Sequence, residues 1–448
     1  MIESLKKIKH SEVYIMNNKI NQGQLFNDII SKEIKEKFYN IDSDPIMNKK
    51  RIFFDNAGGA LRLKTANEIF KKIDELPDCP EHSNYTAKWL LSIQEKAYED
   101  IKIIFNAKSG SLITSLTASM AMFEMTRAII EDVPGTNVVT TALEHPSAFD
   151  SIVMYAKKTG KEVRIAKTNS VTGGVDVNEI TKLVDKDTCV LSVISASNVS
   201  GAVLDIESIV KECRKIKPDL YIVCDSVQHT PHGVIDLEKT PVDAINFAPY
   251  KFFGPRGFGI GYMSERAAKL PHSKLIAKPE GEWELGSPTP AHFSAISEIV
   301  NYVCWIGEKF TDSKDRRELY VEGMNRINMH ERALMYHMLN GSKNVIGLRN
   351  IKGVNVFLDY EDLSTRDFIM AISFDDLGAK QAVYEYEKRG VIVFERLVKS
   401  SYSERMLESF GMSDVVRVSP LHCHTIEDID KFLKITEELS QLLLVQSI

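Results

Sequence analysis

The sequence is poor in cysteine and tryptophan, with six and three among 448 residues. The cysteines have no CxxC spacing, and Cys189 and Cys224 stand in apolar runs. We therefore expect reduced thiols in the core rather than a disulfide framework. His422 and His424 flank Cys423, but no further His, Cys or acidic residue stands at a metal-ligand spacing, so we expect no metal site.

Long apolar runs and an excess of basic residues are also missing. No run approaches the roughly 18 apolar residues of a membrane span, and the N-terminal residues lack the apolar core of a signal peptide. The formal net charge of −6 at pH 7 argues against a basic face for nucleic acid or for a membrane surface. These absences predict a soluble, cytoplasmic protein that binds neither nucleic acid nor a membrane.

A chain of 448 residues is too long for one simple hydrophobic core. We predict an N-terminal arm at residues 1–45 that joins the small domain, a large domain at 46–290 and a smaller α+β domain at 291–448. In the large domain, apolar runs alternate with helical segments, which is typical of an α/β fold with a mainly parallel sheet covered on both faces. The predicted strands are residues 138–140, 163–165, 190–194 and 220–224, with a helix at 206–217.

Beyond residue 290 the order of the predicted elements changes. One long helical region comes first, and strands follow it with a helix between the second and the third. This order favours a separate α+β unit. The predicted elements are a helical region at 294–339, strands at 354–358, 370–374 and 391–394, and a last helix at 426–444.

The most informative pattern is a lysine that follows an acid after 26 residues. Asp225 closes an apolar run, and Lys251 stands among aromatic residues just before a glycine-rich segment. A lysine amine forms an imine with the aldehyde of pyridoxal phosphate (PLP), and a carboxylate keeps the pyridine nitrogen of PLP protonated. The ligand edge of a parallel sheet lies at the carboxyl ends of its strands, where Asp225 is expected. This pair predicts a PLP enzyme.

Four further segments contain residues suited to such a site. Thr117 and Ala118 begin a helical pattern, so they form either a phosphate-binding helix N-terminus or an ordinary helix cap. His145 follows a short strand and either stacks on the cofactor and shuttles protons or is structural. Asn198 lies at a strand end, where it binds the phenolic oxygen of the cofactor or a substrate carboxylate, or forms a plain turn. Gln228 also stands within reach of that phenolic oxygen.

With these motifs in place, residues 45–440 resemble the class V aminotransferase family, in the cysteine desulfurase-like branch of fold-type I PLP enzymes. The most specific element is Asp225-Ser226-Val227-Gln228 followed by Tyr250-Lys251-Phe252-Phe253-Gly254-Pro255. The resemblance implies an α/β large domain with a mainly parallel, seven-stranded sheet and a smaller α+β C-terminal domain.

The resemblance also assigns roles to individual residues by position. It implies that Asn198 and Arg417 face the substrate carboxylate, which suits the planar fork of arginine. Ser287 matches a position that contacts the phosphate of the neighbouring subunit, which implies a homodimer with shared active sites. Tyr250 stands where the family often has a phosphate-binding histidine, and its hydroxyl is still a donor. The implied cofactor contacts are Lys251 as the Schiff-base lysine, Asp225 at the pyridine nitrogen, His145 on the ring, Gln228 at the phenolic oxygen, and Thr117 with Ala118 at the phosphate.

One departure from the family argues against desulfuration as the reaction. Cysteine desulfurases place a nucleophilic cysteine in the loop after a small-domain strand, but residues 394–401 contain none. We therefore expect a PLP enzyme that acts on an α-amino acid, with His145, Asp225 and Lys251 as its catalytic residues. A C–S lyase that works by β-elimination is favoured over a class V aminotransferase. The remaining alternative is a non-catalytic protein that keeps the fold.

Overall fold

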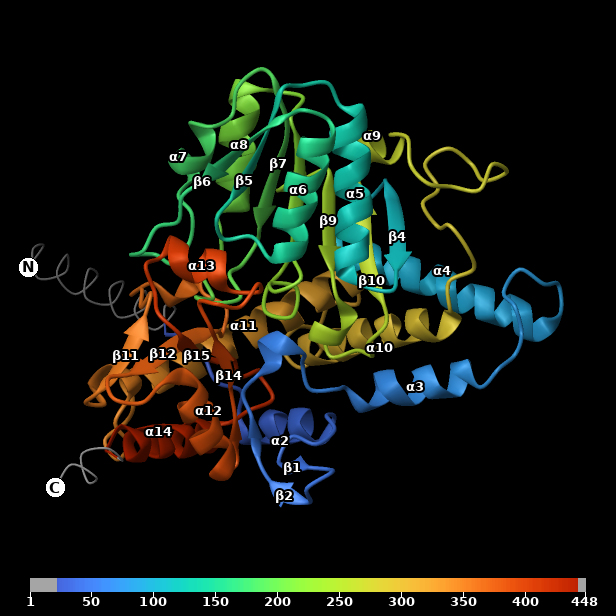
Figure 1. Ribbon diagram of the computed structural model, residues 1–448. Helices are drawn as coiled ribbons and strands as arrows, with labels where there is room; N and C mark the ends of the chain where they lie inside the picture. The colour runs from blue at the N-terminus through green and yellow to red at the C-terminus, as the bar shows by residue number, and fades with distance from the viewer. Residues whose placement is uncertain (1–21, 442–448) are drawn as a thin grey trace, which may run out of the picture.

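The computed structural model describes residues 22–441, so the predicted arm is described only from residue 22 onward (Figure 1). A seven-stranded sheet forms its largest layer, in the order β4-β10-β9-β8-β7-β5-β6. Only β10 runs against the other six strands, because it pairs antiparallel with both β4 and β9. The strands are β4 (Ser111–Ser115), β5 (Asn137–Thr141), β6 (Glu162–Ala166), β7 (Thr188–Ile194), β8 (Tyr221–Asp225), β9 (Ala244–Phe247) and β10 (Gly259–Met263).

Four of the seven strands, β5 to β8, lie within two residues of the predicted ranges, and β7 and β8 are apolar at most positions. Every residue of β5, β7 and β9 is buried, as expected for strands covered on both faces. One face packs against α5 (Ala118–Asp132) and α6 (Pro146–Lys158). The other face packs in a second apolar cluster against α4 (Tyr85–Phe105), α8 (Ile206–Ile216), α10 (Pro290–Gly307) and α11 (Arg316–Asn340). The predicted α/β fold with a mainly parallel seven-stranded sheet is confirmed.

The predicted helical region at 294–339 is two helices, α10 (Pro290–Gly307) and α11 (Arg316–Asn340). Asp315 caps the start of α11, and its side chain accepts a hydrogen bond from the backbone N–H of Glu318. The two helices cross closely at glycines. A Cβ on Gly307 would lie 2.1 Å from the carbonyl oxygen of Leu319, and one on Gly323 would lie 2.0 Å from that of Val303. The sequence pattern is helical on both sides of the break, so periodicity alone did not separate the helices.

A second sheet of four antiparallel strands lies in the C-terminal part of the chain, in the order β11-β12-β15-β14. The predicted strand at 391–394 is divided, because β13 pairs with β3 (Ile52–Phe53) while β14 joins this sheet. The predicted last helix is present, and its residues 442–444 lie outside the described part of the chain. The elements are β11 (Val354–Phe357), β12 (Met370–Phe374), β13 (Val391–Ile392), β14 (Phe394–Arg396), β15 (Val415–Val418), α12 (Ala379–Lys388), α13 (Glu404–Ser409) and α14 (Ile426–Gln441).

The remaining elements join the two sheets. Helices α3 and α4 form a long hairpin that extends to the right of Figure 1. Buried residues of α2 and of α10 belong to the same apolar cluster as Phe247 of β9. The predicted domain boundaries at residues 45 and 290 therefore stay predictions, because packing continues across both positions. The joining elements are α2 (Asp28–Glu36), β1 (Ser43–Asp44), β2 (Lys49–Lys50), α3 (Lys64–Asp74), α4 (Tyr85–Phe105), α7 (Val177–Thr181), α8 (Ile206–Ile216) and α9 (Glu265–Ala268).

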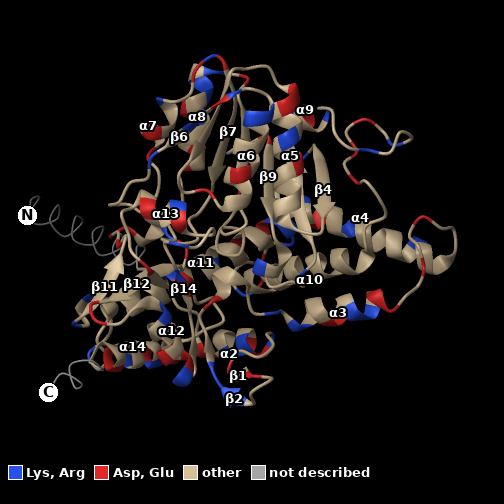
Figure 2. Cartoon of the chain, in the orientation of Figure 1, with Lys and Arg blue, Asp and Glu red and all other residues tan. Residues whose placement is uncertain are grey.

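Charged side chains of both signs are interspersed over the outer helices, as α3 and α14 show (Figure 2). No helix within residues 22–441 combines the length and the apolar character needed to cross a membrane. No group of three or more His, Cys, Asp or Glu side chains in the same residues is arranged to hold a metal ion.

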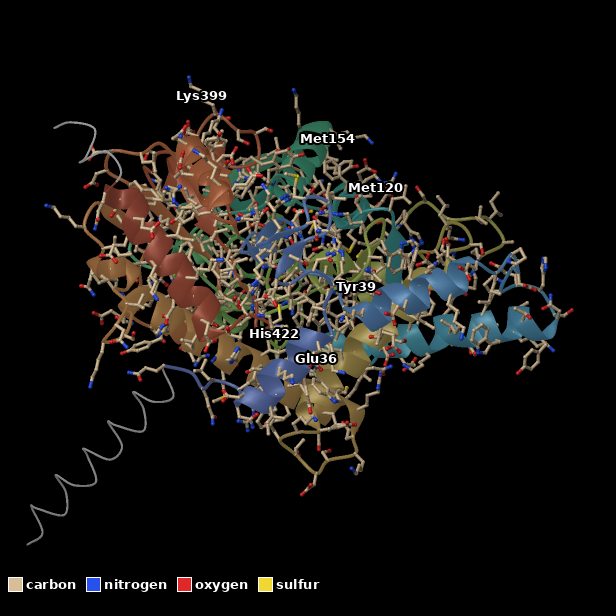
Figure 3. The ribbon with its side chains drawn as sticks, turned by 90° about the horizontal axis from the view of Figure 1, so that it is seen from below. Glu36, Tyr39, Met120, Met154, Lys399 and His422 are labelled. Atoms are coloured by element: carbon tan, nitrogen blue, oxygen red, sulfur yellow. The ribbon has the colours of Figure 1, made fainter. Side chains whose placement is uncertain are left out.

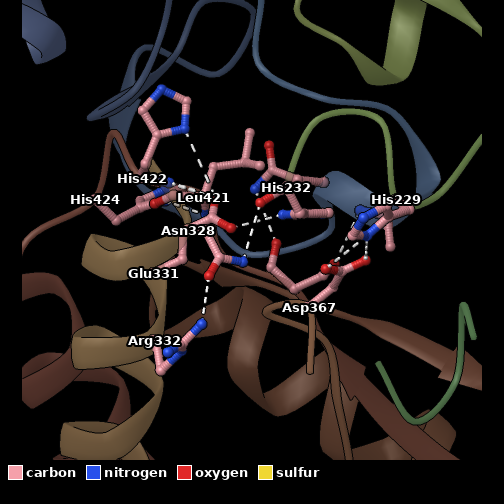
Figure 4. A network of polar contacts seen from close by, with 12 residues as sticks. His229, His232, Asn328, Glu331, Arg332, Asp367, Leu421, His422 and His424 are labelled. Atoms are coloured by element: carbon pink, nitrogen blue, oxygen red, sulfur yellow. Dashed lines mark hydrogen bonds and ion pairs between the residues drawn. The ribbon is translucent and has the colours of Figure 1, made fainter. Parts of the chain in front are cut away.

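A buried polar network connects the segment after β8 to α11 and to the turn after β15 (Figure 4). His232 and Glu331 form its centre, with 2.7 Å between Nδ1 and Oε2. Glu331 also accepts a hydrogen bond from the backbone N–H of His422 at 3.0 Å. His422 lies among interior side chains in Figure 3, and its Nε2 lies 2.7 Å from the hydroxyl of Tyr302. His232, Glu331 and His422 are therefore buried together in one polar network.

Glu331→Gln is expected to destabilise the protein by about 3 kcal/mol, because it removes one partner of a buried ion pair. The charge of Glu331 opposes the effect of burial and raises the pKa of His232 to about 8, and His232 lowers the pKa of Glu331 to about 2. The raised histidine pKa stabilises the fold below about pH 6.5 and loses this effect as the pH rises through 8. The lowered carboxyl pKa stabilises the fold above about pH 4.5 and loses this effect as the pH falls toward 2.

The difference in Tm between wild type and Glu331→Gln should therefore be largest between about pH 4.5 and 6.5. Thermal melts at pH 5.5 and pH 9 measure it. Glu437→Gln, on the outer part of α14, provides a control for the loss of one carboxylate. A difference that is the same at both pH values would show that the ion pair contributes nothing.

Candidate active site

A cavity of about 350 Å³ lies at the carboxyl ends of β7 and β8 and at the start of α5. This is the edge where parallel sheets bind their ligands. The structure brings every predicted site residue to this cavity except Ser287 and Arg417. The predicted residues that line it are Thr117, Ala118, His145, Asn198, Asp225, Gln228, Tyr250 and Lys251.

Lys251 ends a short 3-10 helix, η2 (Pro249–Lys251), directly after β9. The turn is tight, because the N–H of Gly254 donates to the carbonyl of Pro249 at 2.8 Å and Phe253 adopts a left-handed φ of 64°. Such backbone strain persists only where packing enforces it, and the Phe253 ring packs edge-on against Phe38 at 5.4 Å between centroids. Burial, then the charge of Arg417, lowers the pKa of Lys251 to about 8. The amine is therefore much closer to neutrality at pH 7 than an exposed lysine.

Asp225 is the last residue of β8 and is only 2% exposed. Its carboxylate accepts a hydrogen bond from the N–H of Val227 at 3.1 Å. Burial raises the pKa of Asp225, while the Val227 N–H and the charge of Lys251 oppose this shift. A buried carboxylate with few donors is stabilised by a cationic ligand group, such as a protonated ring nitrogen.

Two amide side chains on the cavity wall have unsatisfied oxygens. Oδ1 of Asn198 and Oε1 of Gln228 are buried, and neither has a hydrogen-bond partner among the described residues. Buried polar atoms without partners cost about 1–3 kcal/mol each, so natural proteins rarely leave them except where a ligand or water binds. Rotation of either amide by 180° would present its NH2 group to an oxygen of a ligand.

The start of α5 forms the other end of the cavity. Thr117 is the helix cap, and its Oγ1 accepts a hydrogen bond from the N–H of Met120 at 3.1 Å. Gly259 of β10 lies so close that a Cβ there would be 2.1 Å from the nitrogen of Ala118. The free N–H groups and the dipole of a helix N-terminus bind phosphate. This end of the cavity fits the phosphate of PLP.

His145 caps α6, and its Nδ1 lies 2.8 Å from the hydroxyl of Ser147. Burial, followed by the charges of Lys251, Arg396 and Arg405, lowers the pKa of His145 to about 3. The imidazole is therefore neutral at physiological pH. A neutral, planar ring on the cavity wall is suited to stacking on an aromatic cofactor.

Arg256 also lines the cavity, and the sequence analysis missed it. Its guanidinium lies 4.4 Å from the centroid of the Tyr250 ring. Arg256 follows Gly254 and Pro255 in the glycine-rich segment after the lysine. A cation in such a segment is the feature of the sequence that could have identified Arg256 as a site residue. The Arg256 guanidinium adds positive charge to the cavity that the start of α5 also lines, which favours the binding of a phosphate.

Arg417 and Ser287 lie outside the lining of this cavity. Arg417 is buried on β15, and its guanidinium forms an ion pair of 2.7 Å with Asp55. Ser287 lines a second cavity together with Thr114 and Glu284, and its hydroxyl donates to Glu81. The contact of Ser287 with a neighbouring subunit stays a prediction.

The loop at residues 397–403 follows β14 and carries Tyr402 near the cavity. The ring of Tyr402 lies 6.4 Å from that of His145, between centroids. The hydroxyl of Ser403 donates to the carbonyl of Leu397 at 2.9 Å, which holds the loop closed at its base. The side chain of Lys399 extends away from the protein (Figure 3). None of the six cysteines, all within the described residues, lines the cavity, and five of them are buried.

A parallel sheet whose ligand edge joins a buried lysine, a buried acid and a helix N-terminus defines a PLP-dependent enzyme. The comparison with known families agrees. Residues 52–432 match the family described as Aminotransferase class-V, and the chain belongs to this family. The predicted resemblance and the prediction of a PLP-dependent enzyme are confirmed.

Individual relatives are cysteine desulfurases by name. The chain is 32% identical over 324 residues to Cysteine desulfurase IscS of Buchnera aphidicola, which covers 69% of this chain and 72% of the relative. It is 27% identical over 387 residues to a probable cysteine desulfurase of Borreliella burgdorferi, which covers 76% of this chain and 88% of the relative. The apo structure of a cysteine desulfurase from Thermococcus onnurineus has a TM-score of 0.76 at 17% identity, covering 92% of this chain and 98% of that one.

Proposed function

We propose that the protein is a PLP-dependent C–S lyase that acts on a cysteine-type α-amino acid by β-elimination. The single observation that supports it best is that Lys251, Asp225 and His145 line one cavity beside the start of α5. When bound, PLP supplies an electron sink that stabilises negative charge at the Cα atom of the substrate. The other contributions belong to residues of this chain.

Lys251 is the residue that we assign to covalent attachment of PLP and to removal of the Cα proton. Its pKa of about 8 suits a general base at physiological pH. Asp225 would hold the ring nitrogen protonated, and His145 would orient the ring by stacking. With their amides rotated by 180°, Asn198 and Gln228 would donate from their NH2 groups to the phenolic oxygen or the substrate carboxylate, at the positions that the unpartnered oxygens occupy here.

The lyase is favoured over a desulfurase by the positions of the cysteines. Desulfuration requires a thiolate at the sulfur of the substrate. Burial raises the pKa of Cys189, Cys213 and Cys304 to about 11, and a hydrogen bond with Glu81 raises that of Cys79. In β-elimination no protein thiol is needed, because the Cβ–S bond breaks and the sulfur leaves as a thiol.

We expect the PLP-loaded protein to convert L-cysteine and water to pyruvate, ammonia and sulfide in equal amounts. Product analysis with and without a keto-acid acceptor measures this. Cys79→Ala, which removes the one cysteine that is not buried, should leave the pyruvate rate unchanged.

Other products would contradict the proposal in distinct ways. Alanine together with sulfur bound to the protein would show desulfuration. A keto acid that forms only when an acceptor keto acid is present would show an aminotransferase, which is the second candidate. A homodimer that shares its active sites through Ser287 is part of the proposal, since Ser287 lies outside the cavity of its own chain.

A further inference from the structure

Arg396 is a buried cation without an ion-pair partner of its own among the described residues, because Asp55, whose charge acts on it, already pairs with Arg417. It ends β14 and is 5% exposed. One guanidinium nitrogen donates to the backbone carbonyl of Tyr402, and Nε has no hydrogen-bond partner among the described residues. No Asp or Glu within residues 22–441 forms an ion pair with it, whereas Arg417 has Asp55. A buried charge without a partner is costly, which is typical of sites that receive an ion.

The register of the small sheet places Arg396 beside Arg417. Arg396 pairs with Val415, and Phe394 pairs with Arg417. Val415 and Arg417 are two residues apart, so they face the same side of the sheet, and Arg396 faces that side too. Diagonal neighbours of this kind lie about 7–8 Å apart, within reach of long side chains. The two guanidinium groups therefore form one buried pair of cations.

This pair of cations affects the pKa of residues that line the cavity. After burial, the charges that lower the pKa of Lys251 are those of Arg417 and Arg396, and Arg396 also lowers that of His145. The phosphate of the cofactor has its own site at the start of α5 and at Arg256. One arginine, Arg417, is sufficient for the α-carboxylate of an amino acid. The second arginine, Arg396, is then available for another anionic group.

We propose that Arg396 binds an anionic group on the side chain of the substrate, so that the substrates are cysteine S-conjugates with an acidic S-substituent. This inference rests on the proposed lyase function. The ring of Tyr402 lies near His145 and is 61% exposed, so the loop at 397–403 borders the site where the S-substituent would extend. For S-carboxymethylcysteine, the Cβ–S bond breaks and one water is consumed. The products are pyruvate, ammonia and mercaptoacetate.

The first test compares two conjugates of similar size, S-carboxymethyl-L-cysteine and S-propyl-L-cysteine. The wild-type protein should prefer the acidic conjugate by about 10- to 100-fold in kcat/KM, as expected for charge-assisted hydrogen bonds. Arg396→Gln should lose this preference, because its kcat/KM for the acidic conjugate should fall by about 10- to 100-fold more than its kcat/KM for the propyl conjugate. Arg396→Lys, which keeps the charge, should retain part of the preference. Arg389→Gln, directly after α12, is the control for the loss of an arginine outside the site.

The second test does not need turnover. Succinate and butyrate have the same carbon chain but carry two carboxylates and one. Both lack the amine that reacts with the cofactor. At equal concentration, succinate should raise the Tm of the wild-type holoenzyme more than butyrate does, because it fills both arginine sites. The excess should disappear in Arg396→Gln.

Two results would overturn the inference. The first is equal stabilisation of the wild type by succinate and butyrate, with no preference between the conjugates. The second is an Arg396→Gln variant that weakens both conjugates equally, which would assign Arg396 to the α-carboxylate. A preference for succinate without turnover of either conjugate would instead contradict the proposed lyase function and leave the anion site in place.

Discussion

Lys251→Ala is expected to abolish covalent attachment of PLP and to lower the rate of turnover by at least about 1,000-fold. In the proposed function Lys251 is both the nucleophile that holds the cofactor and the general base for the Cα proton, and a general base alone contributes about 100- to 10,000-fold. The start of α5, where we propose that the phosphate binds, is unchanged in the variant, so PLP should still bind without a covalent bond. Borohydride reduction followed by peptide mass spectrometry measures the attachment directly.

The same experiment has a pH dependence. Only the neutral amine attacks the cofactor, and the pKa of Lys251 is about 8. The attachment rate in the wild type should therefore rise with pH up to about 8 and then level off. An exposed lysine would give a rate that still rises at pH 10.

Lys269→Ala provides the matched control, because Lys269 is an exposed lysine at the end of α9. This variant should bind PLP and turn over substrate as the wild type does. Reduced PLP on a lysine other than Lys251 in the wild type would contradict the assignment.

Asp225→Asn is expected to lower kcat/KM by about 100- to 1,000-fold. The change removes a charge while it keeps the shape of the side chain. The loss of a buried charge partner costs about 3–4 kcal/mol, which corresponds to this change in rate. Steady-state kinetics with the best amino-acid substrate measures it.

The stability of the same variant separates a functional role from a structural one. Burial raises the pKa of Asp225, so the charged carboxylate destabilises the cofactor-free fold at neutral pH. The Tm of cofactor-free Asp225→Asn should therefore equal or exceed that of the wild type, although its activity is lower. Asp205→Asn is the control, because asparagine caps a helix as well as aspartate does. A large fall in the Tm of Asp225→Asn would indicate a structural role.

The central sheet was predictable because burial on both faces leaves a clear pattern in the sequence. Runs such as 190–194 are apolar at nearly every position, and β7 has the predicted location. The break between α10 and α11 was not predictable, since it depends on the close crossing at Gly307 and Gly323. The division of the predicted strand at 391–394 was also not predictable, because β13 finds its partner β3 more than 300 residues away in the sequence.

Most of the site was predictable from residue types placed at strand ends and at a helix start. Asp225, Asn198 and Thr117 are of this kind, and all line the cavity. Arg256 and Arg396 were missed, because an arginine in a loop or at a strand end is most often a solvated surface residue. Only the packing around Arg396 shows that it is buried and that its Nε has no hydrogen-bond partner among the described residues.

The sequence by itself determined the α/β class, the lysine and acid of the site, and the absence of a cysteine at residues 394–401. These features depend on local composition and on the order of the elements along the chain. The tertiary structure decided which charges act on Lys251, because Asp55, Arg396 and Arg417 reach it from distant segments. Electrostatic effects depend on distance in space and on burial, and neither quantity can be read from the order of residues.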